Sequence, residues 1–335
     1  MALVLPIAAS ASCGHAREGS RLARATAATA APLAEKASTE ARVQANTKCE
    51  GCHEEVAREW RGSRHRAAAT NARFMRGFDR EPLAWCVGCH APAFDTEEPL
   101  RAAADIGVSC IDCHRGVETK VAAAQAADHR TPGPANAASP VSCGTCHEFP
   151  FPNQPSVAMQ WTVTEHRRSS FAQTDCGGCH MPPQEGRPHR DHRFEVSDAM
   201  IRQSSSVEVS RTARGISFEL RAGRIGHAFP TGDTFRRIRI EAQTLDASAR
   251  VVEQRTRLLS RRMPKAGPGG RAQMEDDRLF LADSVGRIEL AFERPERTIR
   301  YRIAYERAES ERDEGTPQTD VVELAHGSLP KVRRP

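Results

Sequence analysis

Five copies of one short cysteine motif constrain this chain more than any other feature. Ten of its eleven cysteines occur in C-x-x-C-H, as Cys49/Cys52/His53, Cys86/Cys89/His90, Cys110/Cys113/His114, Cys143/Cys146/His147 and Cys176/Cys179/His180. This pattern is the attachment signature of c-type haem, whose vinyl groups form thioether bonds with the two sulfurs. The adjacent histidine then binds the iron. The motifs predict five covalently bound c-type haems, with ten attachment cysteines and five proximal histidines.

Zinc sites and disulfides are the other common uses of paired cysteines. Zinc ribbons combine two C-x-x-C units to complete four ligands, and five units cannot be divided into such pairs. Neither a zinc site nor a disulfide framework requires a histidine directly after every second cysteine. The pattern therefore favours haem attachment over both alternatives.

The motifs are closely spaced in a chain that is poor in apolar residues. Successive motifs begin 24 to 37 residues apart, which is too short to build a separate core around each haem. Hydrophobic residues make up 39% of the chain, the mean hydropathy is −0.56, and no 18-residue apolar run is present. We therefore expect the haems to pack against one another as a chain of redox centres.

The charge balance is basic and dominated by arginine. The formal net charge is +5, and 43 of the 48 basic residues are Arg. Each ferric haem carries about −1 once its two propionates are counted, so five haems offset the +5. Guanidinium groups bind carboxylates in a bidentate manner, and the Arg excess is interpreted as partners for the propionates. We expect no nucleic-acid partner.

The N-terminal residues 1–45 are expected to form a leader and a flexible tether. Residues 1–12 resemble the end of a secretory signal, and Cys13 followed by Gly14 resembles a lipoprotein acylation site. Cleavage near Ala11 without lipidation is the alternative. Because haem is attached to c-type cytochromes outside the cytoplasm, we expect a periplasmic or other extracytoplasmic location, with membrane attachment if Cys13 is lipidated.

Residues 46–200 contain every motif and are expected to form a loop-rich, mostly helical haem domain with little strand. Helix formers occur at Glu54–Trp60, Ala67–Phe78 and Val157–Phe171. Five irons need second axial ligands, and eight histidines lie outside the motifs. The predicted distal ligands are His65, His129, His192 and His227. The other four are His166 and His189, which compete for the last place, and His15 and His326, which are expected to be bystanders. A five-coordinate haem is the alternative at one site.

The motif surroundings resemble the multihaem cytochrome c-554 family over about residues 46–196. The resemblance rests on Trp60, Ser63 and His65 in W-x-x-S-x-H, on Trp85 before the second motif and H-A-P at 90–92, on G-V-S before the third, on H-M-P at 180–182 and on His192-x-Phe194. G-H-x-x-P-T-G at 226–232 is similar to a segment of multihaem cytochromes with an appended β domain. The resemblance implies axial ligation of haem by His65, His192 and His227, and also by His129.

Two features depart from the family pattern. Five motifs replace the tetrahaem set. In the segment 165–171, His166 stands where the first motif region has Trp60, and Phe171 stands where it has His65. The distal ligand of the fourth or fifth haem is therefore open.

In residues 201–330 the pattern of apolar residues changes to a period of two. Apolar residues alternate with polar ones around Val207, Ile216, Ile238, Ile288 and Ile299, which is typical of half-buried antiparallel strands. About seven strands, with a Gly/Pro loop at 264–271, predict a β-sandwich-like domain. The predicted fold class is therefore α+β, a helical haem domain followed by an antiparallel β domain.

The function that these patterns favour is electron transfer. We expect a multihaem cytochrome that relays electrons between redox partners, such as other cytochromes or a membrane quinol-linked complex. No residue is predicted to be catalytic. The alternative is an oxidoreductase acting on nitrite, hydroxylamine or a related nitrogen or sulfur species, which would need one iron with an open face. A haem-based sensor or structural module is a third hypothesis.

Overall fold

The computed structural model describes residues 38–94, 104–114, 137–151, 154–262, 275–279, 285–308 and 318–332. All of these residues belong to one contact unit of the chain. The expected leader, Cys13, His15, His129 and the loop at 264–271 lie outside the described residues. None of the described helices is long and apolar enough to cross a membrane.

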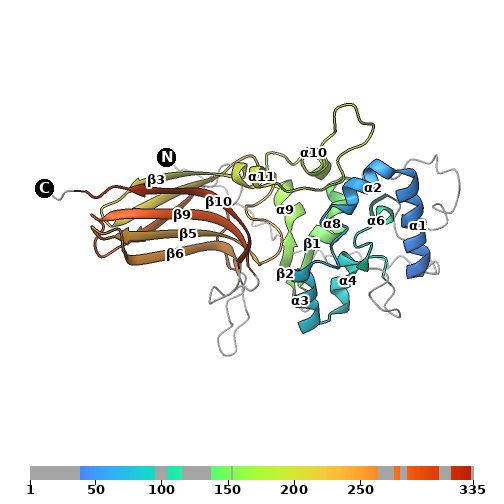
Figure 1. Ribbon diagram of the computed structural model, residues 1–335, viewed down its shortest axis with the longest axis horizontal. Coiled ribbons are helices and arrows are strands. Elements are labelled where there is room, and N and C mark those ends of the chain that lie inside the picture. Colours follow the sequence, from blue (N-terminus) through green and yellow to red (C-terminus); the bar gives the residue numbers. More distant parts are fainter. Residues whose placement is uncertain are drawn as a thin grey trace, which may run out of the picture. The chain divides into compact units, whose positions relative to one another are not determined.

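Short helices dominate the described elements before residue 148, and each haem motif forms the end of one of them (Figure 1). The first motif ends α1 (Thr39–Cys52), with His53 at its C-cap. The others end α4 (Ala84–His90), α6 (Cys110–His114), α8 (Pro140–His147) and α10 (Cys176–His180). Helices without a motif are α2 (Glu54–Arg61), α3 (Ala72–Arg80), α9 (Thr162–Arg167) and α11 (Asp198–Gln203). The proximal histidines therefore all lie at C-terminal helix ends.

A two-stranded antiparallel sheet follows the fourth motif and corrects one sequence prediction. Strands β1 (Glu148–Phe151) and β2 (Gln154–Trp161) pair, with Phe149 opposite Gln160. The predicted helix Val157–Phe171 is therefore wrong over its first five residues, and α9 begins only at Thr162. Pairing with β1 outweighs the weak local helix propensity of this segment.

The predicted helix at 67–78 begins later than expected. The Asn71 side chain accepts a hydrogen bond from the backbone N–H of Phe74 at 2.9 Å and caps α3. An Asn at this position satisfies a helix N–H that has no partner within the helix, which fixes the start of the helix at the next residue. Residues 62–70 form turns instead.

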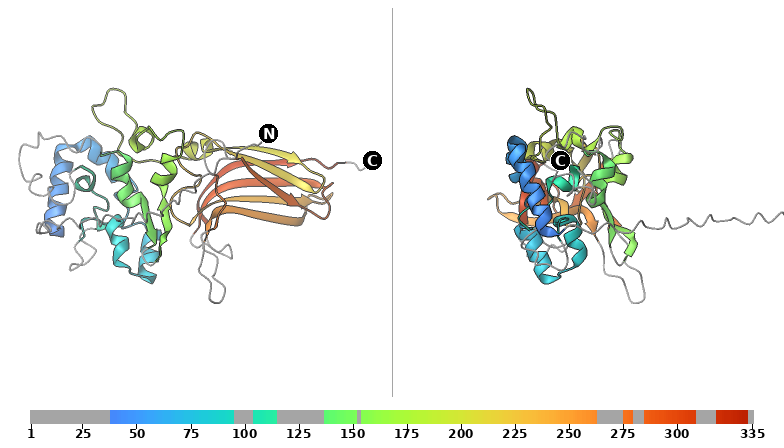
Figure 2. Two further views of the ribbon diagram at one scale, coloured as in Figure 1. Left: turned by 180° about the vertical axis from the view of Figure 1, so that it is seen from behind. Right: turned by 90° about the vertical axis from the view of Figure 1, so that its right-hand side faces the viewer.

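Two antiparallel sheets make up the region after residue 204. Their strands are β3 (Ser205–Arg211), β4 (Gly215–Ala222), β5 (Arg236–Leu245), β6 (Val251–Arg262), β7 (Glu275–Asp276), β8 (Val285–Ala291), β9 (Thr298–Ala308) and β10 (Gln318–Leu329). One sheet has the order β10-β9-β5-β6-β7 and the other the order β3-β4-β8. Figure 2 shows the yellow β3 and β4 lying over the orange and red strands of the larger sheet.

The main apolar core lies between these two sheets. Phe218 and Leu220 of β4 and Ile240 of β5 are fully buried in one cluster with Ile303 of β9. Among the described residues of the helical part, small clusters lie around Val87 and around Trp60. The α+β class and the β-rich C-terminal region are confirmed. A mostly helical haem region is not confirmed, because turns and the β1–β2 sheet occupy much of its described length.

Candidate functional site

All ten motif cysteines and all five motif histidines line one cavity. Its volume is about 2880 Å³, well above the volume of a site for one small ligand. A haem has a van der Waals volume on the order of 500 Å³, so five haems would take up roughly 2500 Å³. None of the ten cysteines is in a disulfide. The size of the cavity and the lack of disulfides among these cysteines both fit the binding of several haems.

Three motif histidines face a histidine from elsewhere in the chain. The ring centroids are 6.0 Å apart for His114 and His192, 6.2 Å for His180 and His227, and 6.3 Å for His147 and His65. Two metal–nitrogen bonds of about 2 Å, with ~1.1 Å from each nitrogen to its ring centre, give roughly 6.2 Å across one iron. Each pair therefore has the spacing that an iron between two imidazoles requires.

A fourth pair with this spacing has no motif member. His189 and His192 have ring centroids 6.3 Å apart, but both lie on the segment after α10. The Nε2 atom of His189 is 3.8 Å from the Glu59 carboxylate. No cysteine pair is attached to either residue, so this spacing does not define a haem position.

Backbone carbonyls orient several of the cavity histidines. The Nδ1 atom lies 2.8 Å from the Ala68 carbonyl in His90, 2.7 Å from the Arg190 carbonyl in His192, and 3.1 Å from the Ala228 carbonyl in His227. Donation of Nδ1–H to a carbonyl leaves Nε2 as the metal-binding atom. This partner arrangement is the one that metal-binding histidines commonly have.

Burial favours the neutral form of several cavity imidazoles. Desolvation lowers the pKa of His65 and of His227 to about 4 in each case. Desolvation also lowers the pKa of His147 and His180. A neutral imidazole is the form that binds a metal, so these side chains need not lose a proton at neutral pH before they coordinate iron.

The thiol contacts show which motifs are neighbours in space. Hydrogen bonding to Cys49 and burial raise the pKa of the Cys110 thiol, and a contact with Cys146 does the same for Cys89. Cys143 of the fourth motif is hydrogen-bonded to Cys176 of the fifth. The first motif therefore adjoins the third, and the fourth adjoins both the second and the fifth. The spatial order differs from the order along the chain.

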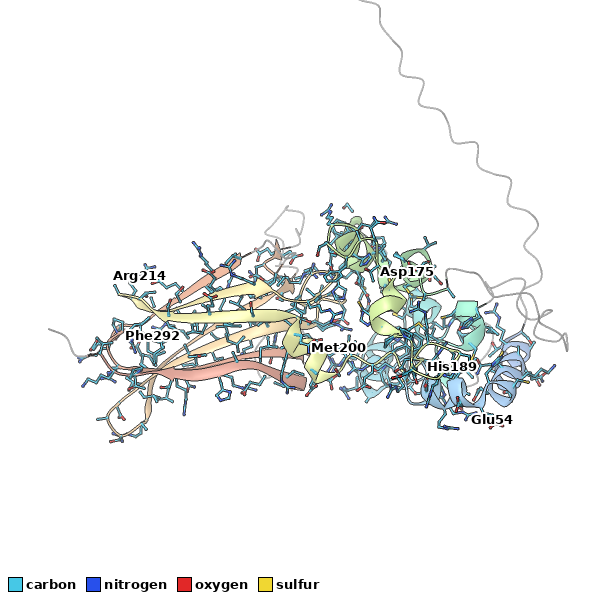
Figure 3. All side chains as sticks on the ribbon, turned by 90° about the horizontal axis from the view of Figure 1, so that it is seen from above. Glu54, Asp175, His189, Met200, Arg214 and Phe292 are labelled. Atoms are coloured by element: carbon cyan, nitrogen blue, oxygen red, sulfur yellow. The ribbon has the colours of Figure 1, made fainter. Side chains whose placement is uncertain are left out.

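The remaining histidines occupy different environments. His53 lines the cavity, and His90 stacks on Phe74 with a centroid distance of 4.1 Å. His166 is buried near Gly226, and His189 lies among the short helices close to Glu59 (Figure 3). His326 lies on β10 with 73% of its side chain exposed, where it contacts Glu323.

Two carboxylates at the site, the half-buried Glu59 and the buried Glu165, were not predicted from the sequence. Glu59 accepts hydrogen bonds from the segment that carries His192, and Glu165 accepts one from the loop that carries His227. Glu59 lies directly before the W-x-x-S-x-H segment that begins at Trp60, and Glu165 lies directly before its counterpart at 166–171. That placement was the available signal, but it does not reveal the distant partners.

A charged cluster lies where the cavity meets the β strands. Asp233 and Arg236 are 3.5 Å apart, and Arg236 also hydrogen-bonds to Tyr305. Burial raises the pKa of Asp233, but Arg236 and Arg307 outweigh this effect and hold it below its usual range. Arg236 also lowers the pKa of both His147 and His227. Its positive charge therefore disfavours protonation of a histidine at the fourth motif and of the histidine that faces the fifth motif.

Comparisons with known proteins agree with these features. Residues 48–116 match the family model described as cytochrome c554 and c-prime. The fold is similar to that of a penta-haem cytochrome c552 from Thermochromatium tepidum, with a TM-score of 0.61 and 19% identity over 88% of this chain and 99% of the other. No curated protein matches the chain at a significant level. The resemblance to multihaem cytochromes c is confirmed, and it implies covalently bound c-type haem.

Proposed function

We propose that this chain is a pentahaem c-type cytochrome that relays electrons between redox proteins. The observation that carries the proposal is the single cavity lined by all five C-x-x-C-H motifs, with three histidine pairs at the spacing of two axial ligands. Haem irons supply the one-electron chemistry. The chain holds the haems, provides axial ligands and limits their contact with water.

The ring pairs support an assignment of the axial ligands. In this proposal His192 completes the haem of His114, His65 that of His147, and His227 that of His180. The proximal ligands of the other two haems are His53 and His90. His129, a predicted distal ligand outside the described residues, remains the candidate for one of them.

The adjacency of the motifs suggests a route for electrons. The third, fourth and fifth motifs follow one another through neighbouring thiols, because Cys113 also acts electrostatically on Cys143. The first motif joins this series at the third, and the second joins it at the fourth. The proposed route therefore runs between the first and the fifth haems, with the second as a branch.

The proposed setting is extracytoplasmic. Haem attachment takes place outside the cytoplasm, and the N-terminal residues resemble a secretory leader with a lipidation site at Cys13. The partners that fit this setting are other cytochromes or a membrane quinol-linked complex. Both exchange single electrons with exposed haem edges.

Replacing His227 with Ala in the full-length holoprotein tests the proposal. The variant should keep all covalent haem but convert one haem in about five to the high-spin state. Pyridine haemochrome analysis counts the haems, and ferric EPR measures the spin states. His326→Ala is the matched control, because His326 is exposed on β10. Fewer than five haems in the unmodified protein would refute the proposed haem count. An unchanged low-spin spectrum in His227→Ala would refute the assignment of His227 as an axial ligand.

The same spectra separate electron transfer from the enzymatic alternative. An unmodified protein with a high-spin fraction near one fifth that turns over nitrite or hydroxylamine would favour the oxidoreductase. Fully low-spin haems without turnover favour the electron relay.

A further inference from the structure

Two segments of the chain share a sequence pattern and the same backbone turn. Residues 59–65 read E-W-R-G-S-R-H, and residues 165–171 read E-H-R-R-S-S-F. Both end a short helix, with C-caps of nearly equal conformation at Gly62 (φ −82°, ψ −5°) and Arg168 (φ −93°, ψ −4°). In both, the cap N–H donates to the carbonyl of the glutamate three residues earlier, at 3.2 and 3.1 Å. Glu59 and Glu165 therefore occupy equivalent places.

Glu59 binds the segment that carries His192. Its carboxylate accepts the backbone N–H of His192 at 2.9 Å, the Gln184 side-chain amide at 2.9 Å and the Arg187 guanidinium at 2.7 Å. Only 10% of the side chain is exposed. Burial raises the pKa of Glu59, but the hydrogen bonds from the His192 backbone and the Gln184 side chain outweigh this effect and lower it. Hydrogen bonds from these three donors thus attach the segment that carries His192 to α2.

Glu165 binds the loop that carries His227. Its carboxylate accepts the Thr231 hydroxyl at 2.6 Å, and the Thr231 and Thr162 hydroxyls are 3.0 Å apart. The other carboxylate oxygen accepts a hydrogen bond from Arg278 at 2.6 Å. Arg278 also donates to the Pro230 carbonyl at 2.8 Å, so it holds the same loop from its other side. Glu165 and Arg278 are both almost fully buried.

The exchange of histidine for phenylalanine in the second segment has a structural counterpart. His65 is itself one member of a ring pair with His147. Phe171, at the equivalent place, lies against Gly226, where an added Cβ would be 3.3 Å from the Phe171 Cβ. The second segment has no histidine at this place and instead supports the loop that carries His227. The first segment supplies its own histidine, His65.

We propose that Glu59 and Glu165 are equivalent positioning residues, which anchor His192 and His227 as distal ligands of the haems on the third and fifth motifs. This inference rests on the proposed function, because it requires those two histidines to bind iron. It predicts that each carboxylate controls one particular haem. A residue needed only for general folding would affect all of them.

The test for Glu165 uses the full-length holoprotein with Glu165→Gln and Thr231→Val. Both variants should change the same low-spin EPR signal that His227→Ala removes, and should leave the other signals in place. The signal should shift or lose intensity to a high-spin species, by up to about one haem in five. Thr231→Val keeps the Glu165–Arg278 ion pair, so it remains informative if the loss of that ion pair in Glu165→Gln prevents folding.

Two further variants serve as controls. Thr231→Ser retains the hydroxyl and should restore the normal spectrum. Glu289→Gln makes the same chemical change at a surface glutamate that contacts Arg214, which lies in the turn between β3 and β4 and is labelled in Figure 3. It should leave every haem signal unchanged.

The test for Glu59 uses Glu59→Ala, which removes the acceptor for all three donors. Its EPR change should coincide with the signal that His192→Ala removes, and should differ from the signal affected by Glu165→Gln. Reduction potentials from spectroelectrochemical titration give a second readout, in which one component of the titration should shift in each variant.

The outcomes separate this inference from the proposed function. If His227→Ala and His192→Ala each remove one signal but the glutamate and threonine variants change nothing, the inference is wrong and the ligand assignment stands. Equal changes in all signals, or loss of haem, would show a general structural role and also overturn it. If His227→Ala and His192→Ala leave the low-spin spectrum intact, the ligand assignment itself fails.

Discussion

The imidazole rings of His180 and His227 are almost parallel, with 10° between their planes at a centroid distance of 6.2 Å. The rings of His114 and His192 are inclined by 24°, whereas those of His65 and His147 are inclined by 58°. The three proposed haems therefore differ in the relative orientation of their axial ligands. This difference has a spectroscopic consequence.

Ring orientation should distinguish the haems by EPR. Parallel imidazole planes act on the same iron d orbital and split the orbital pair widely, whereas strongly inclined planes act on both orbitals more equally. We expect rhombic low-spin signals from the haems of His180 and His114, and a more anisotropic signal from that of His147. The assignment is checked by ferric EPR of His227→Ala, which should remove a rhombic signal. Loss of the anisotropic signal instead would contradict the ring geometry.

Gly107→Ala should destabilise the protein around His65. Gly107 has a φ of +50°, and an added Cβ would collide with the carbonyl oxygens of His65 and Arg66. The strain and the collision together should lower the free energy of unfolding by about 3 kcal/mol. Denaturant unfolding of the holoprotein measures this loss. Gly186→Ala is the control, because Gly186 also has a positive φ but no atom near its Cβ position, and it should cost only about 1 kcal/mol.

Arg236→Gln should lower the reduction potential of the haems nearest to the charged cluster. A positive charge favours the reduced state of a nearby iron, because reduction lowers the positive charge at the metal centre. Removing the charge should shift the potential downwards by on the order of tens of millivolts. Spectroelectrochemical titration measures the shift. Arg300→Gln removes an equal charge from the exposed surface of the β region and should leave the potentials unchanged.

Asp233→Asn should reduce stability at neutral pH and have little effect in acid. Arg236 and Arg307 hold the pKa of Asp233 below its usual range, so the ionised carboxylate stabilises the folded state above pH 3.8. That contribution is lost as the pH falls through the lowered pKa, because the group is then protonated in both states. The variant should be less stable by about 2 kcal/mol at pH 7, and the difference should shrink below pH 3.8.

Denaturant unfolding of the two proteins at a series of pH values tests this expectation. Asp198→Asn, at an exposed ion pair with Arg202, should change stability by less than about 0.5 kcal/mol at any pH. A deficit in Asp233→Asn that is as large at pH 3 as at pH 7 would show that the carboxylate's charge is not responsible.

Several elements were predictable because their signal is local. The two-residue alternation around Ile216, Ile238 and Ile299 indicated strands, and all three residues lie fully buried between the sheets. The resemblance to multihaem cytochromes rests on residues adjacent to the motifs. The strand β6 was missed because the sequence of Val251–Arg262 is mostly polar, although this strand forms a hairpin with the preceding strand β5.

Other features depend on tertiary contacts that have no sequence pattern. The pairing of β2 with β1 replaced part of an expected helix. The partners of Glu59 and Glu165 lie 66 to 133 residues away in sequence. The Arg excess was interpreted as propionate partners, but several arginines instead form ion pairs with carboxylates in the β region, such as Arg237 and Arg239 with Glu306.

The loop that carries His227 connects β4 of one sheet to β5 of the other. A ligand that binds only the folded state adds its binding free energy to the stability of that state. Under the proposed ligation, the bond between His227 and iron is such a term. Strands that touch no haem would therefore become harder to unfold when this bond forms, and the melting of the β sheets would report on the coordination of a metal that lies outside them.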